Sequence, residues 1–264
     1  MNAALLPIRA LNILGVRIDA VSMQGIIAWV QNGIRSNVID QYLIVVNVAK
    51  LIHAREDPNL HRIIEGADLV GVDGMPLVWY SKLLSECLPE KVSGIDIMMR
   101  MFQTGNNERW SFYFLGATDQ VIRRVVDTFR QDYSGAVVAG SRNGYFTQDD
   151  EPHIVKEIRE SGANILLIGF GSPRREMFVD RWKGQFGVNV IHGVGGSFDV
   201  YSGVTKRAPK WMQSAGMEWL YRLVQEPSRL FTRYAVSNTK FLLLVVRDRL
   251  GILDRITIEP KTRA

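Results

Sequence analysis

The stretch Ile165-Leu-Leu-Ile-Gly-Phe-Gly-Ser-Pro-Arg174 decides the fold of this chain. Four consecutive apolar residues predict a buried β-strand, and the two glycines end it. Ser172 suits the cap of a following helix and Pro173 its first position. A strand that is apolar on both faces is typical of a parallel sheet with helices on both sides.

The same succession of a strand, a turn and a helix recurs along the first two hundred residues. Strands are predicted at residues 42–46, 68–72, 112–115, 136–139, 165–168 and 188–191. Helices are predicted at residues 47–55, 75–84, 119–129, 150–160 and from about residue 173. This alternation predicts an α/β fold with a Rossmann-like, mostly parallel sheet and right-handed crossovers, which forms a body over residues 1–203.

The remaining residues, 204–264, predict a basic helical appendage. Helical spacing runs up to Pro227, a second helix is expected over residues 228–250, and a loose tail after Asp254. This part holds 12 Lys and Arg against 5 Asp and Glu, a net charge of +7, whereas residues 1–203 hold 20 against 22. Such asymmetry points to an anionic partner: nucleic acid, a membrane surface or a phosphorylated substrate.

Composition excludes several other classes of protein. With 47% apolar and 22% charged residues, the chain is typical of a soluble globular protein rather than a disordered one. The single cysteine, Cys87, excludes an intrachain disulfide framework, and no run of 18 apolar residues predicts a spanning helix. With four scattered His and no Asp-x-Asp, neither a metal site nor a cofactor is expected.

Glycines follow three of the predicted strands and mark the edge of the sheet where ligands bind in such folds. They are Gly116, Gly169, Gly171, Gly195 and Gly196. Glycine lets backbone N–H groups approach a ligand, and a helix that begins there favours an anion. An ordinary strand-to-helix turn is the alternative at each loop.

Asp73 is the carboxylate most suited to catalysis. It follows a buried-looking strand and precedes Gly74, so it is expected at the same edge of the sheet. A partly desolvated Asp there could act as a general base, or it could cap the helix that begins at Met75. Asp96 and Asp199 also follow glycine-rich turns, and a capping or structural role is expected for both.

Basic and aromatic side chains alternate on the appendage. Arg222, Arg229 and Arg233 are spaced by seven and four residues and would share a helical face if the break at Pro227 does not rotate it away. Such a mixture suits a membrane interface or a phosphate-bearing ligand. A solvated basic face over an aromatic core is the alternative.

Taken together, these residues resemble the WecG/TagA/CpsF glycosyltransferases, glycosyltransferase family 26. The resemblance covers about residues 11–250. Its stretches are Asn47-Val-Ala-Lys50, Ala67-Asp-Leu-Val-Gly-Val-Asp-Gly74, Val92-Ser-Gly-Ile-Asp96, Phe114-Leu-Gly116, Asn143-Gly-Tyr-Phe146, Gly169-Phe-Gly-Ser-Pro173, Gly193-Val-Gly-Gly-Ser-Phe-Asp199, Lys206-Arg-Ala-Pro209 and Glu218-Trp-Leu-Tyr-Arg-Leu223 with Pro227 and Arg229.

The resemblance implies a GT-E-like enzyme at the cytoplasmic face of the cell membrane, held there peripherally by its appendage. It implies inverting, metal-independent transfer from a UDP-sugar to a sugar on a polyprenyl diphosphate. It assigns catalysis to Asp73. Donor binding is expected at Asn47, Gly116, Gly169, Gly171, Gly195, Gly196 and Asp199, and binding of the acceptor diphosphate at Arg207, Arg222, Arg229 and Arg233.

The chain departs from the family pattern at three expected substrate positions. Val45 replaces the Thr of a T-P-N segment, Lys91 the Arg of an R-V-x-G segment, and Arg175 the Gln of a P-x-Q-E segment. These losses favour glucose over N-acetylmannosamine as the donor sugar, as in GumM-like members that assemble exopolysaccharides. The alternative is transfer of N-acetylmannosamine to N-acetylglucosaminyl-diphospho-polyprenol, as in synthesis of teichoic acid or enterobacterial common antigen.

Two more distant classes stay open on sequence grounds. A nucleotide-binding oxidoreductase would need an early G-x-G-x-x-G, and the turn after residues 42–46 has no glycine. A nucleic-acid-binding protein could use the basic appendage, although the family resemblance implies no nucleic-acid partner. The chain leaves its oligomeric state open, and an oligomer is possible.

Overall fold

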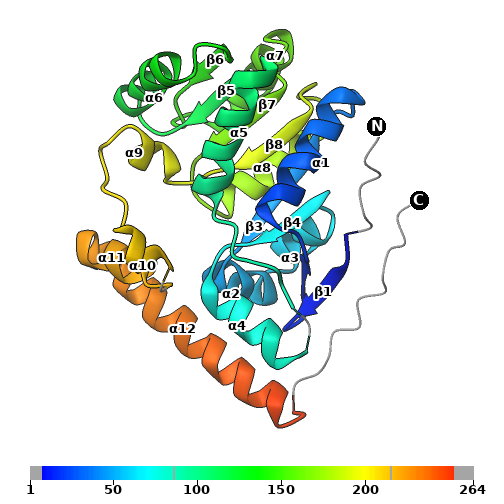
Figure 1. The fold of residues 1–264 in the computed structure, drawn as a ribbon, viewed down its shortest axis with the longest axis vertical. Helices are drawn as coiled ribbons and strands as arrows, with labels where there is room; N and C mark the ends of the chain where they lie inside the picture. Colours follow the sequence, from blue (N-terminus) through cyan, green and yellow to red (C-terminus); the bar gives the residue numbers. More distant parts are fainter. Residues whose placement is uncertain (1–7, 86, 215, 253–264) are drawn as a thin grey trace.

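A parallel sheet of six strands forms the centre of the molecule. The computed structural model describes residues 8–85, 87–214 and 216–252. The strand order is β4-β3-β8-β7-β5-β6, and every neighbouring pair is parallel (Figure 1). The strands are β3 (Gln41–Val46), β4 (Leu69–Val72), β5 (Ser111–Gly116), β6 (Val137–Arg142), β7 (Ile165–Gly169) and β8 (Val190–Gly193).

Helices cover both faces of this sheet, which confirms the Rossmann-like α/β prediction (Figure 1). One face carries α2 (Val48–Glu56), α3 (Pro58–Glu65), α7 (Glu151–Glu160) and α8 (Arg174–Trp182). The other carries α1 (Met23–Arg35), α5 (Gly94–Glu108), α6 (Asp119–Asp132) and α9 (Ser197–Tyr201). Alternate strand residues enter the two separate cores, as Ile44 and Leu43 do. This alternation is why the central strands β3, β5 and β7 are largely apolar on both faces.

The segments that follow the strands gather at one edge of the sheet. β3 and β4 end in register, at Val46 and Val72, and β5 and β7 end at the paired residues Gly116 and Gly169. Because all the strands are parallel, their carboxyl ends meet at this edge. The short helices η1 (Gln148–Asp150) and α4 (Met75–Leu83) complete the body.

An N-terminal hairpin, absent from the sequence prediction, docks beside β4. It pairs β1 (Ala10–Ile13) with β2 (Val16–Asp19) in antiparallel register. Asp19 is buried, pairs with Arg17 at 2.6 Å and accepts a hydrogen bond from the backbone N–H of Val70 at 2.9 Å. The hairpin is therefore held by a long-range polar contact that periodicity does not show.

The described part of the appendage, residues 204–214 and 216–252, forms three helices, and the break that Pro227 predicts is present. α10 (Lys210–Ser214) and α11 (Glu218–Gln225) precede the long helix α12 (Pro227–Arg249). In Figure 1, α12 runs past α2 and α4, and its Phe241 packs edge-on against Tyr80 of α4. Within the described ranges, no helix is both long and apolar enough to cross a membrane.

Two expectations about domain organisation are not settled by these contacts. The division into a body of residues 1–203 and an appendage of residues 204–264 stays a prediction. The expected tail after Asp254 lies outside the described residues.

Candidate active site

Asp73 lies at the carboxyl end of β4, on the ligand edge of the sheet. Its backbone N–H donates to the carbonyl of Val46 at 2.8 Å, which ties it to the end of β3. It does not cap α4, because the N-cap residue is Gly74 and no side chain caps that helix. Gly74 has φ 152°, a conformation that only glycine adopts readily, so the turn after Asp73 needs glycine. The alternative of a capping role for Asp73 is therefore wrong.

The surroundings of Asp73 make it a better base than an exposed carboxylate. Burial raises its pKa to about 6, the carboxylates of Glu218 and Asp96 add to this rise, and Lys91 and Arg222 oppose it. Its carboxylate makes no hydrogen bond to any other described residue. A base with a pKa near neutrality is ionised at pH 7 and still accepts a proton readily.

Two segments bring charged side chains beside Asp73. The backbone N–H of Val92 donates to the carbonyl of Val72 at 2.7 Å, which places Lys91 next to the end of β4. From the other side, Gly216 of the appendage packs on α4, since a Cβ there would lie 2.8 Å from the Met75 side chain. The body and the appendage thus meet around Asp73.

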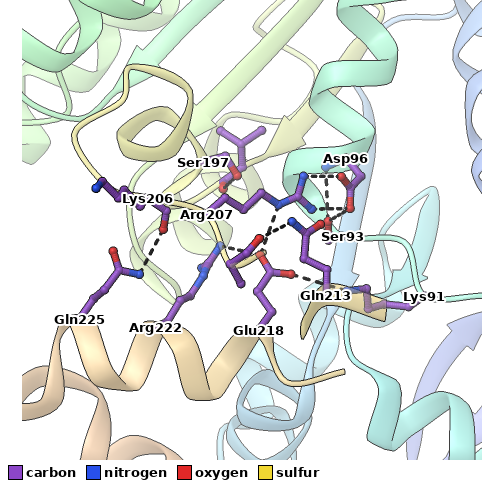
Figure 2. Close-up of polar contacts among 12 residues, drawn as sticks. Lys91, Ser93, Asp96, Ser197, Lys206, Arg207, Gln213, Glu218, Arg222 and Gln225 are labelled. Atoms are coloured by element: carbon purple, nitrogen blue, oxygen red, sulfur yellow. Dashed lines mark hydrogen bonds and ion pairs between the residues drawn. The ribbon is translucent and has the colours of Figure 1, made fainter. Parts of the chain in front are cut away.

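A cluster of ion pairs joins these segments, and we call Lys91, Asp96, Arg207, Glu218 and Arg222 the charged cluster (Figure 2). Glu218 at the start of α11 lies 3.6 Å from Lys91 Nζ, 3.5 Å from Arg207 Nε and 3.6 Å from Arg222 Nη2. Its side chain is 14% exposed, so solvent screens these contacts only partly.

Arg207 is engaged more tightly by Asp96 than by Glu218. Its two terminal nitrogens lie 2.8 Å from the two oxygens of Asp96. Arg207 and the hydroxyl of Ser93 outweigh burial and hold the pKa of Asp96 below its usual range. Asp96 has a structural role, as expected, and Arg207 links the body to the appendage besides facing the site.

The arginines of the appendage fall into two groups. Arg222 points into the charged cluster, and its electrostatic effect reaches Asp73. Arg229 and Arg233 lie on the first turns of α12, but their side chains are outside the described part of the structure. The common face predicted for the three arginines therefore stays a prediction.

The glycines of the ligand edge serve different purposes. A Cβ at Gly169 would lie 2.2 Å from the ring of Phe198, so this position is glycine because an aromatic ring fills the space. Gly116 has φ 141°, and a Cβ there would lie 2.6 Å from the backbone of Gly169. Around Gly171 nothing lies within 4 Å of a Cβ, so this loop is open to a ligand. Ser172 does not cap α8, whose N-cap residue is Pro173.

A buried ion network lies beneath the loop of residues 193–196. Glu176 Oε1 is 2.8 Å from Lys50 Nζ and 2.7 Å from Arg175 Nη2. Burial raises the pKa of Glu176, but Lys50 and Arg175 outweigh it and hold that pKa well below its usual range. Arg175 packs against Gly193, is 6% exposed and is held by Glu176. Arg175 thus lies beneath the loop that contains Gly195 and Gly196 and supports it.

Three other predicted site residues take structural positions. Val45 is 8% exposed and packs in the core, so its side chain does not face the ligand edge as expected. Asn47 caps α2 by accepting a hydrogen bond from the backbone N–H of Lys50 at 2.9 Å. Asp199 lies in the first turn of α9, with its carboxylate near Gly196.

Glu218 is the site residue that sequence reasoning missed as a functional group. It lies in one of the quoted family stretches and four residues before Arg222, a spacing that predicts a helical ion pair. Its contacts with Lys91 and Arg207 depend on docking of the appendage. In the described ranges, no three His, Cys, Asp or Glu side chains gather where they could hold a metal ion.

Known proteins resemble this chain over most of its length. Two relatives, from Bacillus spizizenii and Bacillus subtilis, are both named N-acetylglucosaminyldiphosphoundecaprenol N-acetyl-beta-D-mannosaminyltransferase. The first is 28% identical over 206 residues, covering 78% of this chain and 79% of the relative. The second is 29% identical over 203 residues, covering 77% and 78%. A sequence profile of the glycosyl transferase WecG/TagA/CpsF family matches residues 11–255, so this chain belongs to that family of glycosyltransferases.

Proposed function

We propose that this glycosyltransferase moves N-acetylmannosamine from its UDP-linked donor to N-acetylglucosamine on a polyprenyl diphosphate, with inversion at the anomeric carbon. The observation that carries the proposal is the position of Asp73. This carboxylate, with a pKa of about 6, faces a charged cluster to which both the body and the appendage contribute. A base beside cations is the combination that a sugar acceptor on a diphosphate requires.

The residues divide the chemistry between them. Asp73 takes the proton from the acceptor hydroxyl as that oxygen attacks the anomeric carbon. The bond from this carbon to UDP breaks, and its electron pair leaves on the phosphate oxygen. The open loop at Gly171 and the exposed Gly196 offer backbone N–H groups to the donor phosphates, whereas the N–H of Gly195 donates to the carbonyl of Ile168 at 3.3 Å. Lys91, Arg207 and Arg222 offer charge to the acceptor diphosphate.

Two donor sugars are candidates, N-acetylmannosamine and glucose. The glucose hypothesis rests on Val45, Lys91 and Arg175, but Val45 is in the core and Arg175 lies under a loop, paired with Glu176. Only Lys91 remains beside Asp73, and it retains the positive charge of the Arg that it replaces. The names of both relatives specify N-acetylmannosamine, a beta product and a diphosphoundecaprenol acceptor. These points support N-acetylmannosamine and give glucose no support.

The decisive experiment is a donor and acceptor screen with the full chain. UDP-N-acetylmannosamine, UDP-glucose and UDP-N-acetylglucosamine are each offered with N-acetylglucosaminyl- and glucosyl-diphospho-lipids. We expect turnover with the first donor and the first acceptor. Turnover of UDP-glucose alone would restore the glucose hypothesis. We also expect full activity in excess chelator, and loss of activity that magnesium restores would reject metal independence.

The role of Asp73 has its own test. Asp73→Asn keeps the shape of the side chain but cannot accept the proton, so turnover should fall at least about 100-fold. The control is Asp149→Asn, which makes the same chemical change at an exposed position of η1. Melting temperatures show whether the variants fold. Wild-type turnover by a folded Asp73→Asn enzyme would remove Asp73 from the mechanism.

The appendage is proposed to hold the enzyme peripherally at the cytoplasmic membrane surface. Its net charge of +7 and the exposed apolar side chains of α12, among them Phe231 and Leu242, support this. Apolar burial and attraction to anionic lipid together give the binding that neither gives alone. An appendage that docks at the membrane would deliver a lipid-linked acceptor directly to Asp73.

A further inference from the structure

Glu218 stands among three positively charged side chains from three parts of the chain. Lys91 comes from the segment before α5, Arg207 from the segment before α10, and Arg222 from α11 (Figure 2). All three nitrogens lie 3.5 to 3.6 Å from the Glu218 carboxylate. Positive charge from the body and the appendage thus surrounds the Glu218 carboxylate.

The contacts around Glu218 are ion pairs without hydrogen bonds. Charge-assisted N–H···O bonds are about 2.7–2.9 Å long, shorter than all three contacts. Glu218 Oε1 and Arg207 Nε are buried and have no hydrogen-bond partner in the part of the chain that the structure describes. Leaving a buried charged group unsatisfied is unfavourable. Glu218 therefore occupies the centre of the cluster without satisfying it, whereas Asp96 meets Arg207 at 2.8 Å.

The charges of the cluster suit a more highly charged anion than a carboxylate. Lys91, Arg207 and Arg222 are cationic, and Asp96 neutralises one of the three charges. Within the charged cluster itself, the two positive charges that remain equal in number the two negative charges of a diphosphate diester. With Glu218 in place only one positive charge remains, so the unloaded site attracts a diphosphate less strongly.

We propose that Glu218 is an internal counter-ion that holds the place of the acceptor diphosphate and moves aside when the diphosphate binds. This inference rests on the proposed function and adds to it a residue that sets acceptor affinity. Glu218 and Arg222 are one turn apart on α11, so a change of rotamer at Glu218 withdraws its carboxylate while Arg222 stays in place. The diphosphate oxygens then take the hydrogen bonds that Arg207 Nε lacks.

The test measures binding of inorganic pyrophosphate to the full chain by calorimetry. Glu218→Gln keeps the size of the side chain and removes the competing charge, so the Kd should fall about tenfold, the effect of one charge-assisted contact. Glu160→Gln, which changes the same charge at an exposed and remote position, should leave the Kd unchanged. With the lipid-linked acceptor, the Glu218→Gln enzyme should show a lower acceptor KM and an unchanged donor KM.

The outcomes separate this inference from the function on which it rests. If Arg222→Ala does not weaken pyrophosphate binding, the diphosphate site of the proposed function is misplaced. If Arg222→Ala weakens binding but Glu218→Gln leaves it unchanged or weaker, Glu218 is a structural ion-pair partner and the inference is wrong. Should Glu218→Gln fail to fold, Glu218→Asp decides, because its shorter side chain keeps the charge but reaches the cations less well. Tighter binding by that variant supports the inference, and unchanged or weaker binding overturns it.

Discussion

Arg207 and Asp96 form a bidentate ion pair, in which Arg207 Nη1 lies 2.8 Å from Asp96 Oδ1 and Arg207 Nη2 lies 2.8 Å from Asp96 Oδ2. Asp96 belongs to α5 of the body, and Arg207 to the linker of residues 204–209 that precedes α10 in the appendage. Gln225 and Gln213 hold the same linker by donating to the carbonyls of Lys206 and Ala208 (Figure 2). These contacts hold the appendage to the body beside the candidate active site.

Breaking this bidentate ion pair should make the linker easier to cleave. Asp96→Asn leaves a neutral amide opposite Arg207, so local opening becomes easier and trypsin should cleave after Lys206 at least about ten times faster. Limited proteolysis with mass spectrometry measures the rate. Glu108→Gln, which breaks the exposed pair of Glu108 with Arg35, is the control and should leave cleavage unchanged. Equal cleavage of the Asp96→Asn and wild-type proteins would show that other contacts hold the linker.

The pH dependence of turnover should report the surroundings of Asp73. A base works only when it is deprotonated, so kcat should fall as the pH drops through about 6. Lys91 lowers the pKa of Asp73, so Lys91→Met should move this acid limb to higher pH. Glu218 raises that pKa, so Glu218→Gln should move the limb to lower pH. Profiles of kcat between about pH 4.5 and 8.5 check the direction of both shifts. Shifts of the same sign in both variants would contradict this assignment.

How much of the fold the sequence predicts depends on the range of the interactions involved. β3, β7 and the helices after them follow from local apolar runs, and α11 ends and α12 begins at the break expected from Pro227. The hairpin β1–β2 escapes prediction because polar residues interrupt both of its strands and its Asp19 is buried by a contact with Val70. A local pattern cannot show a polar contact between residues far apart in the chain.

The candidate site shows the same difference between local sequence signals and long-range contacts. The position of Asp73 at the end of β4 is predicted correctly because a strand and a glycine flank it, which is a local signal. Gly169 is predicted to approach a ligand, but the ring of Phe198 fills the space beside its Cα. The glycine alone does not reveal this tertiary contact. Glu218 looks like a solvated acid on a basic helix until docking of the appendage surrounds it with Lys91 and Arg207.

The glycines Gly169 and Gly171 should respond differently to the same substitution. Gly169→Ala drives a Cβ into the ring of Phe198, so it should destabilise the fold by about 1–3 kcal/mol, the usual effect of overpacking. Gly171→Ala adds a Cβ with nothing within 4 Å, so the melting temperature should stay unchanged. If the Gly171 loop binds the donor phosphates, that variant should still raise the KM for the UDP-sugar several-fold. Thermal melts and donor kinetics measure the two effects, and an unchanged donor KM would place the donor elsewhere.

Membrane binding should depend on one exposed face of α12. Phe231 and Leu242 lie eleven positions apart, close to three turns of about 3.6 residues, so they share a face, and each is 63% exposed. The double variant Phe231→Ser with Leu242→Ser removes apolar area without opening the core. Because burying each such side chain contributes about 1.5–3 kcal/mol, partitioning to phosphatidylglycerol vesicles should fall at least about tenfold.

Two comparisons make the vesicle measurement specific to the appendage. Ile39→Ser removes an exposed apolar side chain from the body, between α1 and β3, and should leave partitioning unchanged. Raising the salt concentration should weaken binding of the wild-type protein, since screening reduces the attraction between the basic appendage and anionic lipid. If the double variant bound vesicles as the wild type does while salt still released both, electrostatics alone would hold the enzyme at the surface. The apolar face of α12 would then have no part in docking.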